Sequence, residues 1–147
     1  GLWPGTTNAP AVAGFAEALR LACEELGPDS ARIAALSERL VAGLTAAVPG
    51  SMRNGRDPIP HCVSLRFAGI GGEILLSALA QAGVAASFGS ACADEASKPS
   101  HVLSALGLSP AEARRTLRFG LGRFTTEAEI DLAVDVVRGM AERLRKD

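Results

Sequence analysis

The sequence predicts a two-layer α/β domain in which a short sheet packs against helices. Segments with apolar residues at helical spacing follow one another along the chain, interrupted by short runs in which apolar and polar residues alternate. Hydrophobic residues make up 48% and charged residues 21% of the 147 positions, as in a globular domain with its own core. Helices interleaved with short strands are typical of one sheet layer covered by one helix layer.

Two helices are expected at the beginning of the chain. The first covers residues 11–26 and starts near Asn8 or Ala9, with Pro10 in its first turn, where proline is well suited. Gly27-Pro28 is expected to end it, because neither residue favours a helix interior. The second runs from Asp29 or Ser30 to about Val48, with an apolar face every three to four residues.

The rest of the chain predicts three strands and four further helices. Thr126 and Glu129 have the spacing of a capping box, which marks the start of the last helix. The expected strands cover residues 61–67, 84–87 and 116–121, and the expected helices cover residues 73–82, 100–106, 110–114 and 126–144.

The overall charge and the cysteines exclude several classes of function. The formal net charge of −1 predicts no general attraction to nucleic acid or to an acidic membrane surface, so neither is an expected partner. Three cysteines without a CxxC spacing argue against a disulfide framework and a zinc site, and no metal site is expected. Cys23 and Cys62 lie in apolar patterns and are expected in the core. A reducing cytoplasm is the expected location.

Cys92 is the candidate nucleophile. It follows Ser87-Phe88-Gly89-Ser90-Ala91, and the polar run of residues 93–100 after it is typical of an exposed loop. A thiol on such a loop can reach a substrate, and the thiolate is the reactive form. The alternative is a small buried cysteine that only packs.

Arg118 and Thr6 are candidate binding residues. Arg118 lies in an apolar strand, where a bare charge is costly, and its guanidinium matches a carboxylate with two parallel hydrogen bonds. An arginine that points to water, or a structural ion pair, would explain the same pattern. Thr6 follows Gly5, and this pair could hold a phosphate or be an ordinary glycine turn.

Three motifs resemble a known family. Gly89-Ser90-Ala91-Cys92, followed by Pro99-Ser100-His101-Val102-Leu103, is similar to the catalytic loop of cysteine desulfurases, which are class V enzymes dependent on pyridoxal phosphate. The segment from Leu117 to Thr126 resembles the part of the family that follows this loop. Gly5-Thr6 resembles its phosphate loop, so the similarity is collinear over nearly the whole chain.

The resemblance implies a fold, a cofactor and a role for each candidate residue. Residues 27–147 would be the small C-terminal domain of a fold-type I pyridoxal-phosphate enzyme, and residues 1–26 the phosphate-loop segment and a connecting helix from its large domain. Cys92 would attack the sulfur of L-cysteine and keep it as a persulfide, with L-alanine released. Arg118 would bind the substrate carboxylate, and Thr6 the cofactor phosphate across a homodimer interface.

The chain is expected to be part of a larger enzyme. Its only lysines, Lys98 and Lys146, lie on a polar loop and near the end, whereas an amine that holds a cofactor must be desolvated or lie beside another cation. The isolated chain is therefore expected to be inactive. The resemblance further implies sulfur-acceptor or scaffold proteins as partners, as in iron–sulfur cluster assembly.

The sequence departs from the family pattern at four places, and other functions stay open. A selenocysteine lyase, another class V enzyme, or a degenerate domain that only dimerises or binds a partner would each fit the same motifs. The departures are Trp3-Pro4 ahead of Gly5, Phe88 close to Cys92, Ala93-Asp94 after it, and Gly120 after Arg118.

Overall fold

The computed structural model describes residues 5–56, 58–88 and 100–144. It consists of two compact units, Gly1–Arg32 and Ile33–Asp147, which are described separately below.

Helix α1, Ala9–Ala47, contributes to both units. Asn8 precedes it, and its Oδ1 accepts a hydrogen bond from the Ala11 backbone N–H at 3.2 Å, as the expected start requires. Pro28 lies inside the helix, so the predicted end at Gly27-Pro28 is wrong. Proline has a helical φ and removes one backbone hydrogen bond, and the carbonyl of Glu24 that loses its partner belongs to an exposed turn where water can replace it.

The first unit carries its apolar side chains on the outside. Val12, Phe15, Leu19 and Leu26 are all exposed. Cys23 is exposed as well, so its expected place in the core is wrong. The helical spacing was correct, but spacing alone does not show which face is covered.

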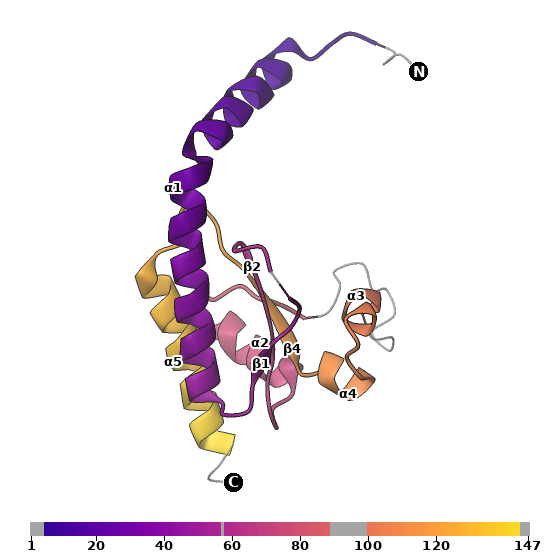
Figure 1. Cartoon of the computed structure of the whole chain (residues 1–147), viewed down its shortest axis with the longest axis vertical. Coiled ribbons are helices and arrows are strands. Elements are labelled where there is room, and N and C mark those ends of the chain that lie inside the picture. Colours follow the sequence, from indigo (N-terminus) through magenta and orange to yellow (C-terminus); the bar gives the residue numbers. More distant parts are fainter. Residues whose placement is uncertain (1–4, 57, 89–99, 145–147) are drawn as a thin grey trace. The chain divides into compact units, whose positions relative to one another are not determined.

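The second unit is built on a four-stranded antiparallel sheet (Figure 1). The strands are β1, Met52–Arg53; β2, Cys62–Arg66; β3, Ser87–Phe88; and β4, Thr116–Gly120. Their order is β1-β2-β4-β3, so the last strand in the sequence lies between β2 and β3. The fold class predicted from the sequence, a short sheet packed against helices, is confirmed.

One face of the sheet forms the core with three helices. Val63, Leu65 and Leu117 are fully buried at 0% exposure and belong to one cluster with the apolar residues of the helices. Gly43 allows α1 to approach α5 closely, because a Cβ there would lie 2.6 Å from Val134 Cγ2. The helices are the second half of α1, α2 (Gly72–Gln81) and α5 (Glu127–Leu144).

Two short helices, α3 (His101–Ala105) and α4 (Pro110–Ala113), lie in the chain between β3 and β4. They stand on the side of the sheet away from α1 and α5 (Figure 1). The predicted strand at 84–87 is displaced, since only Ser87 is shared with β3. The Val84 N–H instead bonds to the Leu79 carbonyl at 2.9 Å and closes the end of α2.

None of the helices over the described ranges has both the length and the apolar character of a membrane span.

Candidate functional site

The face of the sheet opposite the core carries the polar side chains of the strands. β2 and β4 pair so that Ser64 lies opposite Arg118 and Cys62 opposite Gly120. β3 places Ser87 on the other side of Arg118. Residues directly opposite in neighbouring strands project to the same face, so Ser64, Arg118 and Ser87 form a row across three strands.

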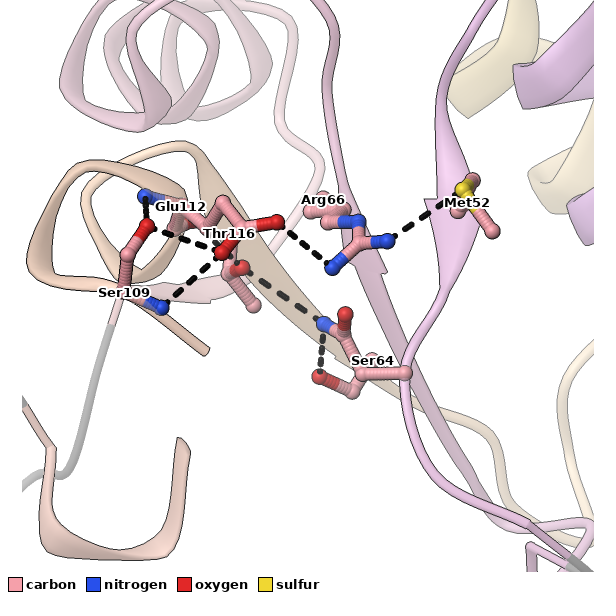
Figure 2. A network of polar contacts seen from close by, with 7 residues as sticks. Met52, Ser64, Arg66, Ser109, Glu112 and Thr116 are labelled. Atoms are coloured by element: carbon pink, nitrogen blue, oxygen red, sulfur yellow. Dashed lines mark hydrogen bonds and ion pairs between the residues drawn. The ribbon is translucent and has the colours of Figure 1, made fainter. Parts of the chain in front are cut away.

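A network of polar contacts holds α4 against this outer face (Figure 2). Arg66 Nη1 donates to Glu112 Oε1 at 2.8 Å, and Glu112 Oε2 accepts from the Ser109 backbone N–H at 2.9 Å. Hydrogen bonds from Ser109, and then the charge of Arg66, hold the pKa of Glu112 below its ordinary value. The Thr116 hydroxyl donates to the Glu112 carbonyl at 2.9 Å. The start of β4, two residues before Arg118, is thereby tied to α4.

A pocket of about 300 Å³ opens beside Arg118. This volume is at the lower end of the range for small-molecule sites, which suits a ligand of a few atoms. Its apolar lining comes from two places. Val102 and Leu103 of α3 and Leu106 directly after it contribute one side, and Pro58 and Ile59 of the loop before β2 contribute the other. The remaining lining residues are Asn54, Cys62, Ser64, Ser100, Thr116 and Arg118.

Arg118 is exposed, and its guanidinium makes no hydrogen bond or ion pair with any other residue that the structure describes. Its position in an apolar strand does not bury it. Leu117 and Phe119 point to the core, and the alternation of β4 puts Arg118 between them on the opposite face. Among the described residues nothing occupies the N–H donors of its fork, which can therefore bind a carboxylate.

Thr6 lies in the first unit, at the start of the described chain. Gly5 has a φ of +115° with no neighbouring atom within 4 Å of a built Cβ, and Thr6 is exposed. Both precede the N-terminus of α1, where the helix dipole favours an anion. The N–H groups of the first turn are already engaged, since Ala9 donates to the Thr7 carbonyl and Ala11 to Asn8 Oδ1, so the hydroxyl and backbone N–H of Thr6 would be the donors. These features fit a phosphate group.

Cys92 lies outside the described residues, but the residues that flank its segment are described. Before the segment, Ser87 pairs directly with Arg118 and Phe88 with Leu117. After it, Ser100 precedes α3 and lines the Arg118 pocket. The chain therefore leaves and re-enters the described structure beside Arg118.

Two pocket residues were missed by the sequence analysis. Cys62 is only partly buried and lines the pocket, so its predicted place in the core is wrong. The alternation of Cys62, Ser64 and Arg66 in one strand was the signal that it shares their face. Asn54 follows β1, and no local pattern indicated that it would be buried against residues so distant in sequence.

Groups of three or more His, Cys, Asp or Glu side chains that could hold a metal ion do not occur among residues 5–56, 58–88 and 100–144.

The family model for Aminotransferase class-V matches residues 2–133. The chain belongs to this family. A relative from Arthroderma benhamiae, named cysteine desulfurase, mitochondrial, is 48% identical over an alignment of 149 positions that covers 99% of this chain and 29% of the relative. The human protein named cysteine desulfurase is 42% identical, again over 99% of this chain and 32% of its own length. The chain thus spans about a third of the length of these curated relatives.

Solved structures agree with this family assignment. A NifS-like protein superposes with a TM-score of 0.80 at 27% identity, over 95% of this chain and 35% of that chain. The cysteine desulfurase CsdA from Escherichia coli has a TM-score of 0.72 at 24% identity, over 97% of this chain and 33% of that one, and shows the same fold. The predicted resemblance to cysteine desulfurases is confirmed.

The names of the relatives contradict the predicted cytoplasmic location. The relatives from Arthroderma benhamiae, Candida albicans and Saccharomyces cerevisiae are all named as mitochondrial proteins, so the predicted cytoplasmic location is wrong. The prediction relied on the absence of a disulfide pattern, and that pattern separates oxidising from reducing compartments but not one reducing compartment from another.

Proposed function

We propose that this chain supplies the C-terminal part of a cysteine desulfurase that converts L-cysteine to L-alanine and leaves the sulfur on Cys92 as a persulfide. The observation that carries the proposal is the position of the Arg118 guanidinium, which has no partner among the described residues. It lies between Ser87 and the pocket that Ser100 lines, and these two residues are close to the ends of the segment that contains Cys92. A carboxylate on Arg118 would therefore be held near the thiol.

Arg118 binds and orients the substrate in this proposal. Its fork accepts a carboxylate through two parallel hydrogen bonds, which restrict rotation as well as translation of the amino acid. The pocket beside it is small and partly apolar, and suits a short uncharged side chain such as that of cysteine.

Cys92 is the sulfur acceptor. Its thiolate attacks the sulfur of L-cysteine, and the Cβ–S bond of the substrate breaks. The carbon takes up a proton to give L-alanine, while the sulfur remains bound to Cys92. A persulfide of this kind can pass to an acceptor or scaffold protein, and iron–sulfur cluster assembly is the destination we propose.

The residues of the first unit fit the phosphate of pyridoxal phosphate, the cofactor of this family. Thr6 would hold the phosphate through its hydroxyl and backbone N–H, beside the N-terminus of α1. When bound, the cofactor supplies an electron sink for charge that develops at the substrate carbon. We propose that the complete protein is a homodimer and takes its cofactor lysine from outside this chain, and we expect the 147-residue chain alone to be inactive.

Replacing Cys92 by serine in the complete holoenzyme tests the acceptor role. The hydroxyl is a far poorer nucleophile toward sulfur, so sulfur release from L-cysteine is expected to fall to background. The visible absorption of the bound cofactor should stay unchanged. Alanine production at a near-normal rate in the Cys92→Ser enzyme would rule out this residue as the acceptor.

Replacing Arg118 by lysine tests the carboxylate clamp. Lysine keeps the charge but loses the fork, and a lost charge-assisted hydrogen bond costs about 1.5–3 kcal/mol. We expect kcat/KM for L-cysteine to fall about ten- to a hundred-fold, with little change in the thermal midpoint because Arg118 is exposed.

Arg114→Lys is the matched control, since Arg114 is an exposed arginine close in sequence that does not line the pocket. Normal turnover in Arg118→Lys, or equal losses in both variants, would exclude the clamp.

A further inference from the structure

The Arg118 pocket is lined by a thiol that the proposed reaction does not use. Cys62 is the first residue of β2, is partly buried, and lines the pocket together with Arg118. It lies opposite Gly120, which has no side chain to cover it, and two positions along β2 from Ser64, the partner of Arg118. The Cys62 thiol and the Arg118 guanidinium thus share one face of the sheet and one pocket.

Asn54 provides a separate indication that this pocket takes a ligand. The residue is 6% exposed, and its Nδ2 donates to Ser64 Oγ at 3.1 Å. Its Oδ1 is buried and has no hydrogen-bond partner among the residues that the structure describes. A buried acceptor without a donor is costly and rare in folded proteins. A ligand that brings an N–H group into the pocket would supply the missing donor.

We propose that Cys62 is a site of covalent modification by small disulfides that carry a carboxylate and an N–H donor, the chemistry of amino-acid disulfides. Arg118 binds the carboxylate, Asn54 Oδ1 accepts from the nitrogen, and the Cys62 thiolate attacks the nearer sulfur. The disulfide bond of the reagent breaks, and its other half leaves as a thiolate that takes up a proton from water. Cys62 is oxidised to a mixed disulfide, and the departing half is reduced to a thiol.

The modification would close the pocket. The attached half-disulfide keeps its carboxylate on Arg118 and fills part of a volume of about 300 Å³, so a second carboxylate cannot reach the guanidinium. The inference shares Arg118 with the proposed function but requires neither Cys92 nor a cofactor. It applies to the 147-residue chain whether or not that chain takes part in catalysis.

Cys23 is the internal reference for a test. It is an exposed thiol on α1, and it precedes Glu24 and Glu25, which do not favour an anionic reagent. Peptide mapping by mass spectrometry follows Cys62 and Cys23 separately in one reaction.

Three disulfide reagents distinguish the carboxylate contact with Arg118 from the N–H contact with Asn54. L-Cystine carries both the carboxylate and the ammonium group, 3,3′-dithiodipropionate carries only the carboxylate, and cystamine carries only the ammonium group. We expect the ratio of the Cys62 rate to the Cys23 rate to be about ten-fold higher for the two carboxylates than for cystamine, the effect of one charge-assisted hydrogen bond.

Substitutions of Arg118 and Asn54, with Arg114 as the control, test which residue recognises which group of the reagent. Arg118→Gln should abolish the preference for carboxylates, and Arg114→Gln, outside the pocket, should leave it intact. Asn54→Ala should lower the rate with L-cystine relative to 3,3′-dithiodipropionate. Unfolding of the unit would be recognised by a rise in the Cys62 rate with all three reagents, and in that case Asn54→Ser replaces Asn54→Ala.

The inference is overturned if the rate ratio is the same for all three disulfides, or if Arg118→Gln leaves the preference unchanged. Because the assay needs no turnover, its failure is distinct from failure of the proposed function, which would show only in the Cys92→Ser and Arg118→Lys holoenzymes.

Discussion

The two faces of the four-stranded sheet use the same strands for opposite purposes. On the core face, Val63, Leu65 and Leu117 are fully buried and pack against α1, α2 and α5. On the outer face, Ser64 and Arg118 occupy the alternate positions of β2 and β4. Apolar contacts need no directional partner, so the core face is completed by packing alone.

On the outer face, a few polar contacts fix α4 to the sheet, and other polar groups lack a partner among the described residues. The Arg66–Glu112 ion pair and the Ser109–Glu112 capping box fix α4 (Figure 2). Asn54 Oδ1 and the Arg118 guanidinium have no partner among the described residues. The buried Asn54 Oδ1 costs stability while it lacks a donor, whereas the exposed Arg118 guanidinium is hydrated by water, and a ligand can use both groups. The comparison therefore predicts that the core face determines stability and the outer face determines binding.

The largest expected effect on stability comes from the core face. Leu65 is 0% exposed, and Leu65→Ala is expected to lower the free energy of unfolding by about 2–5 kcal/mol through lost burial and a residual cavity. Ser64→Ala, the neighbouring position on the outer face, should cost at most about 1.5 kcal/mol, because it removes one partner of Asn54. Denaturant unfolding of both variants measures the difference. Equal losses would contradict the division between the faces.

Two glycine-to-alanine substitutions, one at the contact between α1 and α5 and one away from it, are expected to change stability in opposite directions. Gly43→Ala places a Cβ at 2.6 Å from Val134 Cγ2, and such overpacking is expected to cost about 1–3 kcal/mol. Gly139→Ala, at an interior position of α5 with no atom within 4 Å of a built Cβ, should stabilise by up to about 1 kcal/mol from helix propensity. Thermal and denaturant midpoints should therefore move in opposite directions. A stabilising Gly43→Ala would show that the two helices do not approach as closely as described.

The smallest expected effect is a pH dependence from the outer face. The folded-state pKa of Glu112 is lowered by Ser109 and Arg66, so its contribution to stability is present above the unfolded pKa of about 4.3 and is lost as the pH falls through the folded value. Denaturant midpoints measured from pH 6 down to pH 3 should decline less steeply in Glu112→Gln than in the wild-type chain.

Glu142→Gln is the control for this measurement, because Glu142 is exposed on α5 and makes no ion pair with another described residue. The same slope in Glu112→Gln and the wild-type chain would show that the Arg66–Glu112 network is not formed in solution.

Several elements could be predicted because their signals are local. The Thr126–Glu129 capping box was predicted, and the Thr126 N–H donates to Glu129 Oε2 at 2.8 Å at the start of α5. The same spacing at Ser109 and Glu112 was present in the sequence but went unused. The motif around Cys92 identified the family because adjacent residues carry it.

Other features could not be predicted because they depend on residues distant in sequence. Asn54 and Thr116 are 62 residues apart, and their side chains meet only because β4 pairs with β2. Pro28 was expected to end a helix, since local propensity does not show what the neighbouring turns can tolerate. Residue spacing shows which side chains share a face of α1 or β2, but it does not show whether another element packs on that face. Cys23 and Cys62 were therefore both wrongly expected in the core.

The sequence by itself determined the kinds of elements, most of their boundaries, the alternation of apolar and polar residues in β2, and the family to which the chain belongs. Periodicity, capping and short motifs act over a few residues and need no tertiary contact. Only the tertiary structure decided that β4 lies between β2 and β3, and that Arg118, Asn54 and Cys62 line one pocket. Strand pairing and burial are set by the whole core, which selects one arrangement from the many that the local patterns permit.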